Sequence, residues 1–343
     1  MRFYCLSVLF LLMLIGSPLP AAAQPEAADS GYISRFPQSI TARVYLQEKV
    51  SVFQLNDRHF KKRLNYYPNN YLAIGAGLTI RGIGLNVSMA IPFRDKKESL
   101  YGKTRKLDLQ LHRYKNKWAA DGYFQYYQGF HLRDLTAVTQ VVGPEAYPYF
   151  PDLRSITIGA SLLYMPQGER FSLGAGWNQQ ERQLKSGGTL LVGSAFFGHF
   201  ISNKGHSILP EFSSYPQFLD SAQLAYLHNY ALTLRGGYAY ALVYRRHWFL
   251  AAAADAGVGP ALNTASDIEG QHRQKVGWQL SATARLALGY NAQKWYAGAI
   301  GILHGDRFPL AYEGGVGYSS QGVVRLVVAR RLFFEGGHRF WAP

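Results

Sequence analysis

The sequence has almost no cysteine, because Cys5 is the only one among its 343 residues. Cys5 lies in an N-terminal stretch with the features of a secretory signal: Arg2, an apolar segment over residues 6–15, and small residues at 21–23. Cleavage there would remove Cys5, so we expect a mature chain without disulfides, thiolate metal sites or a cysteine nucleophile. Because Cys5 does not stand at the cleavage site, we do not expect a lipid anchor.

A long apolar run is also missing. The apolar part of the signal is short and is soon followed by Pro18 and Pro20, which disfavours a spanning helix, and no longer apolar run follows it. A bilayer accepts only helices or closed barrels, since every backbone polar group must find a partner within the protein. An exported chain without such a helix is either soluble or a barrel, and the composition, with 24 Tyr, 20 Phe and 35 Gly and few charges in the expected strands, favours the barrel.

Acidic residues are scarce, with 21 Asp and Glu against 36 Lys and Arg and a formal net charge of +15. This balance disfavours an acidic porin-like surface. It suits anionic lipid headgroups or an anionic solute, and it does not choose between them. The basic residues lie mostly in expected turns rather than along one face of a helix or sheet, so nucleic acid is not an expected partner.

Three segments end in Tyr, cross a short and mostly basic turn, and restart on Trp: Tyr114–Trp118, Tyr244–Trp248 and Tyr290–Trp295. Tyr and Trp favour the headgroup level of a bilayer, where an apolar ring and a polar tip are both accommodated. Three such hairpins predict an aromatic girdle at one membrane interface, and hence a transmembrane β-barrel. The alternative is a soluble β-protein with ordinary aromatic hairpins.

Apolar and small or polar residues alternate with a period of two along much of the chain, as in Ile83–Ile91. This pattern predicts an all-β fold, a transmembrane antiparallel β-barrel of 12–14 strands, an even number being usual. The expected strands are 39–53, 71–80, 83–91, 107–112, 118–127, 155–162, 171–178, 189–201, 229–243, 248–258, 275–288, 295–304 and 322–334, with a further short one over 311–319.

Early connectors alternate between short (81–82, 115–117, 166–169) and long (54–70, 92–103, 128–153), which is typical of periplasmic turns and external loops. This order breaks between 181 and 226, so either a strand is hidden near 207–226 or one expected strand is wrong. The external loops would carry a basic set that contacts lipopolysaccharide phosphates or simply stays solvated: Arg58, Lys61, Lys62, Arg63, Arg94, Lys96 and Lys97.

The expected organisation is a signal peptide over 1–23, a short N-terminal segment over 24–37, and a barrel over 38–343. The expected location is the outer membrane of a Gram-negative bacterium, with outer-membrane lipid as surroundings. The barrel assembly machinery is the expected partner during insertion. The oligomeric state is left open.

Two stretches carry a family resemblance. One runs from Tyr101 through the strand to Gln110 and on to Gly129, and the other is Glu181–Thr189 with Phe171 and Ser172 ahead of it. With Tyr67–Asn69 and Gly237–Tyr240, they resemble a family of Bacteroidota outer-membrane proteins known as domain of unknown function 4421. The resemblance spans about Tyr45 to Phe334 and implies an outer-membrane barrel without implying an activity. The chain departs from common barrels in ending Phe340-Trp341-Ala342-Pro343, because the terminal aromatic residue that the assembly machinery recognises is not last.

Inward-facing polar residues gather on the strands that flank the Lys115–Lys117 turn. A hairpin centred on Asn116 would place Asp121 opposite Leu111, in hydrocarbon. A shift by one residue instead sets His112 against Asp121 and Asp108 against Gln125, and we prefer it because it keeps Asp121 in the lumen. Arginines on other strands would also face inward and offset the carboxylates. The expected lumen-lining polar residues are Arg43, Asp108, Gln110, His112, Asp121, Gln125, Arg285 and Arg325, with Tyr123 and Arg235 beside them.

For these residues, a hydrogen-bonded network that fills or rigidifies the lumen is the favoured interpretation. The most concrete function that the polar face and the positive charge suggest is passage or binding of a small polar or anionic solute. The alternatives are a structural or interaction barrel with a filled lumen that binds envelope components through its loops, and catalysis. Nothing favours an enzyme: Gly102-Lys103-Thr104 lacks the earlier glycine of a phosphate loop because residue 97 is Lys, and His199 and Ser194 fall on opposite faces of a strand. We therefore expect no catalytic residue, cofactor or metal.

Overall fold

The computed structural model describes residues 31–37, 39–80, 83–91, 98–133, 147–210, 219 and 223–333. The expected signal peptide and the residues from Phe340 to Pro343 lie outside these ranges. The strands are β1 (Ile33–Arg35), β2 (Ser39–Asp57), β3 (Lys62–Pro68), β4 (Ala73–Ile80), β5 (Ile83–Ala90), β6 (Arg105–Lys115), β7 (Trp118–Leu132), β8 (Tyr149–Tyr164), β9 (Glu181–Gln183), β10 (Gly187–Ser202), β11 (Leu224–Tyr244), β12 (Trp248–Asp267), β13 (His272–Asn291), β14 (Trp295–Pro309) and β15 (Gly315–Phe333). Within the described ranges, two short helical segments accompany them, α2 (Glu98–Tyr101) and the π-helical turn η1 (Gly174–Asn178). Among the helices of the described ranges, none has the length and apolar character to cross a membrane.

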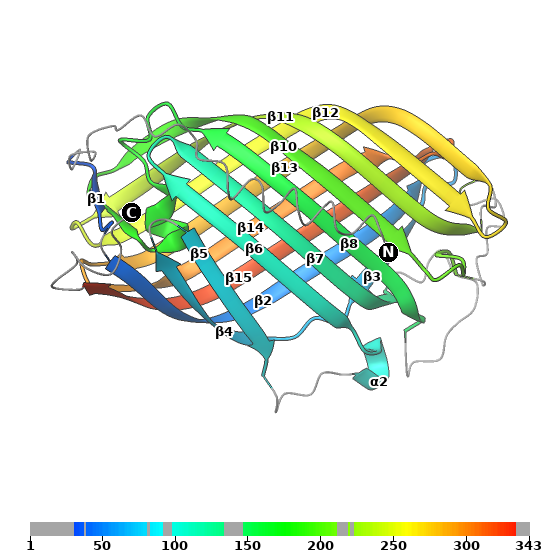
Figure 1. Ribbon diagram of the computed structural model, residues 1–343, viewed down its shortest axis with the longest axis horizontal. Coiled ribbons are helices and arrows are strands. Elements are labelled where there is room, and N and C mark those ends of the chain that lie inside the picture. Colours follow the sequence, from blue (N-terminus) through cyan, green and yellow to red (C-terminus); the bar gives the residue numbers. More distant parts are fainter. Residues whose placement is uncertain are drawn as a thin grey trace, which may run out of the picture.

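Thirteen strands form one antiparallel sheet that closes on itself through the pairing of β15 with β2. Twelve of them make the ring, and β3 is added at one end between β2 and β7. Figure 1 shows the strands slanting around a cylinder, with β1 at its left end and α2 toward its right. The predicted transmembrane barrel of 12–14 strands is confirmed.

The alternation of side chains along each strand explains why this sequence closes into a membrane cylinder. On β13, Gln279 and Ser281 are buried inside, whereas Trp278 and Leu280 are 67% and 46% exposed on the outer face. The same parity holds along the other strands, so the outer wall is a continuous apolar band and the polar side chains meet in the lumen. Hydrocarbon rather than water is the solvent that such an outer wall requires.

Aromatic side chains rim the apolar band at the end where the short turns lie. The rings of Trp118 and Tyr164 are 5.0 Å apart, and those of Trp248 and Tyr290 are 5.4 Å apart, measured between centroids. Tyr114 was expected in this girdle, but it is only 7% exposed and lies in the lumen. The reason is parity, because the even residues of β6 point inward.

The predicted strand over 171–178 is wrong. These residues are buried within the barrel, where η1 and the short β9 form a plug over residues 165–186 that enters from the turn end. β1 pairs with β9, so Ile33–Arg35 packs on the same plug. The alternation of Phe171, Leu173 and Trp177 with small residues therefore reflects packing inside the lumen. With this strand removed, the order of turns and loops is regular along the chain.

Two further expectations are corrected at the loop end. The predicted loop 54–70 contains β3, which pairs with residues 53–57 of β2 because Leu64 and Tyr66 are buried under the neighbouring loops. The predicted strands 311–319 and 322–334 are one strand, β15, preceded by a turn over 310–314. The break in order is explained by the wrong strand over 171–178, and of the described residues between 207 and 223 none belongs to a strand.

Apolar side chains fill the lumen at both ends. A turn-end cluster packs the plug residues Phe171, Leu173 and Trp177 against inward residues of the wall such as Phe249 and Tyr296. A loop-end cluster joins inward residues of the wall with loop residues: Phe53, Leu55, Leu64, Tyr66, Phe130, Leu132, Ile208, Leu219, Phe308 and Leu310, among others. Burying this much apolar surface stabilises both closures. Between the two clusters the lumen is polar.

Candidate functional site

The polar lumen begins at the hairpin of β6 and β7, which has the shifted register. His112 stands opposite Asp121, and Asp108 stands opposite Gln125. His112 Nδ1 lies 2.7 Å from Asp121 Oδ1, and the Tyr114 hydroxyl donates to the same oxygen at 2.6 Å. Asp121 therefore lies in the lumen with two neighbours from its own hairpin.

Arginines from the opposite wall complete the pairing of these carboxylates. Arg285 on β13 donates to Asp121 Oδ2 at 3.1 Å and to Asp255 Oδ1 at 3.0 Å. Arg235 on β11 donates through Nε to Asp255 Oδ2 at 2.6 Å and through Nη2 to the hydroxyl of Thr283 at 2.7 Å. Asp255 is thus held by two guanidinium groups in a site from which water is largely excluded, where such charge-assisted bonds are strong.

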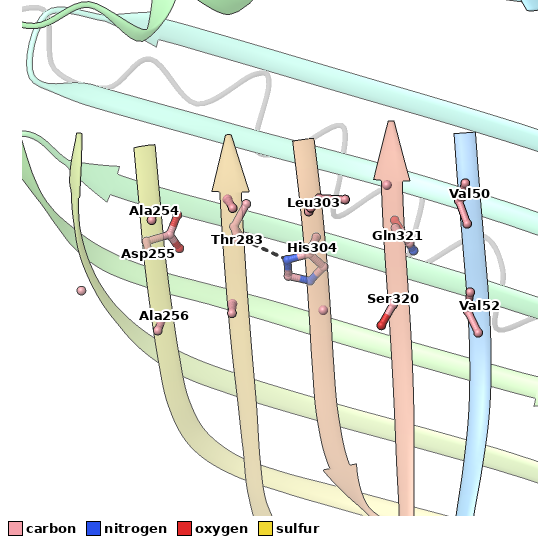
Figure 2. A pocket seen from close by; sticks show the side chains of 15 residues that line it. Val50, Val52, Ala254, Asp255, Ala256, Thr283, Leu303, His304, Ser320 and Gln321 are labelled. Carbon is pink, nitrogen blue, oxygen red and sulfur yellow. Dashed lines mark hydrogen bonds between the residues drawn. The ribbon is translucent and has the colours of Figure 1, made fainter. Parts of the chain in front are cut away.

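A second carboxylate, Asp306 on β14, lies at the centre of a histidine cluster. Its Oδ2 is 3.1 Å from His199 Nε2 and 2.9 Å from His304 Nε2. Gln279 and Ser281 donate to its Oδ1 at 3.1 and 2.7 Å. Figure 2 shows how the two halves join: Asp255, Thr283 and His304 lie on three neighbouring strands, and His304 Nδ1 is 3.0 Å from the Thr283 hydroxyl.

A separate set of polar contacts joins β6 and β7 to β2 and β15. Lys49 of β2 pairs with Asp108, and Gln125 donates to the same carboxylate at 3.2 Å. Arg325 of β15 donates to Gln47 at 2.9 Å and to Gln110 at 3.3 Å. All eight expected lumen-lining residues therefore point inward, and seven of them bond within this network. Arg43 is the eighth, and its Nε and Nη2 have no hydrogen-bond partner within the described part of the chain.

The sequence analysis did not predict several members of the network. Lys49 and Asp255 stand at inward positions of strands that were expected, so parity alone would have found them. Asp306 lies beyond the expected end of its strand at 304. The contact between His199 and Asp306 joins β10 to β14, which are not neighbours in the sheet, and sequence pattern carries no signal for a contact across the lumen.

The plug is attached to the wall by its own polar contacts. Arg331 at the end of β15 donates to the carbonyl oxygens of Gln179 at 2.7 Å and Glu181 at 3.0 Å, and to Asn291 Oδ1 at 2.8 Å. The Glu181 side chain meets Arg35 of β1 at 3.3 Å. Burial raises the pKa of the Glu181 carboxyl, and the hydrogen bond from Ser172 and the nearby Arg35 oppose this rise.

The network encloses little free space. The cavity within the network measures about 110 Å³, room for a few waters, and its lining includes His112, Asp121 and Arg285. A second hollow of about 730 Å³ borders the wall formed by β11–β15 and β2, and its lining combines outward small residues such as Ala254 and Ala256 with the inward residues Asp255 and His304 (Figure 2). Histidine and aspartate offer acid and base groups, and here the two kinds of side chain contact each other, His112 with Asp121 and His199 and His304 with Asp306. Over the described ranges, no group of three or more His, Cys, Asp or Glu is arranged to hold a metal ion.

Comparison with known proteins places the chain in a family. The profile described as "Domain of unknown function (DUF4421)" matches residues 27–327. No curated protein matches the sequence. Among solved structures, the chain is similar to the outer membrane protease OmpT from Escherichia coli, with 9% identity, a TM-score of 0.40, and coverage of 87% of this chain and 98% of that one.

Two channels show weaker similarity. The Pseudomonas putida toluene transporter TodX has 9% identity and a TM-score of 0.27, covering 87% of this chain and 90% of its own. An anion-selective porin from Comamonas acidovorans has 8% identity and a TM-score of 0.17, covering 85% and 100%. A protease and two transport proteins at such distances do not choose an activity. The family match over most of the sequence shows that the chain belongs to the DUF4421 family.

Proposed function

We propose that this protein is a non-conducting barrel of a Gram-negative outer membrane, and that it acts as a structural or interaction protein through its loop end. The observation that carries this proposal is the filling of the lumen. The turn-end cluster, the polar network and the loop-end cluster follow one another along the axis. A solute that crossed the barrel would have to displace both apolar clusters and break charged bonds between them.

The charges of the central network also favour a scaffold over an anion pathway. Its carboxylates Asp108, Asp121 and Asp255 each contact a Lys or Arg side chain, and Asp306 contacts two histidines. Paired charges of this kind fix the relative positions of strands, and an anion that passed through would have to break these pairs. Passage of a small polar or anionic solute, the other function suggested by the sequence, would need a second and open arrangement of the same side chains.

The proposed partners lie outside the barrel. Arg58, Lys61, Lys62 and Arg63 belong to the β2–β3 hairpin at the loop end, where basic side chains would meet lipopolysaccharide phosphates. Arg94, Lys96 and Lys97 lie outside the described residues. Contact with lipopolysaccharide, insertion by the barrel assembly machinery, cleavage of the signal peptide and a Bacteroidota source remain part of the proposal.

Single-channel recording in planar bilayers tests the closed lumen. We expect the purified protein to insert without producing current steps at any salt concentration, because no continuous aqueous path crosses the two apolar clusters. An open porin added to the same bilayer checks that conductance is detectable, and protease protection in liposomes checks insertion of the protein itself. Steps whose size scales with salt concentration would refute the proposal and favour solute passage.

A further inference from the structure

Two arginines face outward near the loop end of the barrel, on strands that are separated by a single strand. Arg105 of β6 pairs with Gln128 of β7, and Gln128 pairs with Arg154 of β8, so these residues form one row across the sheet, the arginine row (Figure 1). Their chain neighbours Tyr127 and Leu153 point inward, into the loop-end cluster. Arg105 is exposed and Arg154 is half-buried. Since neighbouring strands lie about 4.8 Å apart, the two arginine backbones are about 10 Å apart.

The next outward row toward the turn end is apolar. Leu107 pairs with Tyr126, and Tyr126 pairs with Ile156. Leu107 is 50% exposed on the outer wall. The arginine row therefore stands at the edge of the apolar band, where the outer wall passes from acyl chains to lipid headgroups.

The charge of the arginine row is not balanced on its own face. Among the outward positions of β6, β7 and β8, Asp152 is the only carboxylate, and it pairs with Lys204. Within the described part of the chain, neither Arg105 nor Arg154 belongs to an ion pair. Two like charges at the surface of a membrane favour an anion between them.

The backbone beside the arginine row is fixed by contacts of its own. Gly129 forms a bulge in β7 with a φ of +90°, and a Cβ there would lie 2.2 Å from the carbonyl oxygen of Lys103. The Thr104 hydroxyl donates to the carbonyl oxygen of Gly129 at 2.7 Å, and the Tyr149 hydroxyl donates to that of Lys103 at 2.5 Å. These bonds tie the start of β6 to β7 and β8, so the spacing of the arginine row is set without a ligand.

We propose that the arginine row binds a phosphate group of lipid A, the phosphorylated glycolipid of a Gram-negative outer leaflet. A guanidinium group binds phosphate through two parallel N–H bonds, and arginines on both sides of Gln128 can hold one phosphate from two directions. The acyl chains of the same molecule lie on Leu107, Tyr126 and Ile156. Free phosphate would gain nothing from this apolar row, so the surface favours a lipid.

This inference rests on the proposed outer-membrane location and names a lipid partner at a place apart from the β2–β3 hairpin. It does not depend on the closed lumen, because the arginine row lies on the outer face of the wall. A wild-type protein that conducts ions would refute the closed lumen and leave this site unaffected.

Native mass spectrometry of the full-length protein in micelles that contain diphosphoryl lipid A tests the site. We expect saturable binding to the wild-type protein. Arg105→Gln and Arg154→Gln should each weaken it by about tenfold, since each removes charge-assisted bonds to phosphate. Lipid A from which both phosphates have been removed should bind the wild-type protein at least as weakly. Both variants should fold, because neither arginine belongs to the lumen network, and unchanged tryptophan fluorescence checks this.

Arg113→Gln is the matched control, because Arg113 is an exposed, outward arginine at the turn end of the same strand as Arg105. It should bind lipid A as the wild type does. A second background separates the site from the β2–β3 hairpin, and there Arg105→Gln should still weaken binding by about tenfold: Arg58→Gln, Lys61→Gln, Lys62→Gln and Arg63→Gln combined.

Three results would overturn the inference. The first is equal binding of lipid A with and without its phosphates. The second is wild-type binding by both Arg105→Gln and Arg154→Gln, or an equal loss in Arg113→Gln. The third is displacement of lipid A by phosphatidylglycerol as readily as by further lipid A, which would show a surface for anionic lipid in general.

Discussion

Asp255→Ala lowers the free energy of unfolding by about 3–5 kcal/mol, the expected cost of breaking a buried ion pair by removing one partner. The side chain of Asp255 is 1% exposed, and it accepts hydrogen bonds from Arg235 and Arg285. Without it, two buried guanidinium groups share fewer acceptors in a region of low dielectric. Equilibrium unfolding in micelles, followed by tryptophan fluorescence, measures the change.

A double variant distinguishes stability lost through unpaired charge from stability lost through poorer packing. Adding Arg235→Leu to Asp255→Ala removes one of the two buried guanidinium charges that lost their acceptor. The double variant should therefore regain a clear part of the free energy of unfolding that the single variant loses. Glu169→Gln is the control for an exposed pair, since Glu169 meets Lys117 at 3.2 Å with 67% of its side chain exposed, and should change stability by less than about 1 kcal/mol. Equal stability of the single and double variants would show that the network is not held together by charge.

Arg331→Ala releases the plug. Arg331 is 2% exposed and donates to the carbonyl oxygens of Gln179 and Glu181, so its removal takes a charged donor from both, although Asn291 still donates to that of Glu181. Two charge-assisted bonds of this kind correspond to about a hundredfold increase in the population of an opened plug. Tryptic cleavage after Arg182 and Lys185, timed by mass spectrometry, should accelerate by the same factor.

The neighbouring residue supplies the control for this variant. Arg330 points outward and stacks over Trp295 at 5.2 Å, so Arg330→Ala should leave the cleavage rate unchanged. A plug that stays as protected in Arg331→Ala as in the wild-type protein would mean that the turn-end cluster alone holds it. The plug would then be anchored by apolar contacts and not by Arg331.

The strands were predictable because their outer side chains face hydrocarbon. Residues such as Leu85, Val87 and Met89 must all be apolar because they face lipid, so apolar residues recur at every second position of the strand. The register of β6 and β7 was predictable for the same reason, since only one choice keeps Asp121 out of lipid. Where one face of a strand must contact hydrocarbon, the sequence pattern is enough to predict the strand and its register.

The interior was harder to predict because two kinds of surroundings produce the same pattern. Phe171, Leu173 and Trp177 alternate with small residues as a lipid-facing strand does, yet they pack inside the barrel. Tyr114 looks like a girdle residue, yet it bonds to Asp121. Contacts across the lumen, such as that of His199 with Asp306, depend on which strands lie opposite one another, and this follows from strand number and closure rather than from any local motif.

The run Ala251–Ala254 on β12 allows the most direct test of a filled cylinder in a membrane, because four consecutive alanines alternate between the two faces. Single cysteines at these positions are treated with a thiol-reactive spin label in liposomes. We expect labels at 252 and 254 to be accessible to oxygen dissolved in lipid and shielded from a water-soluble nickel complex, while thiols at 251 and 253 stay unreactive. Ready labelling of 251 and 253 by a water-soluble reagent would contradict the account, since it would show an open lumen.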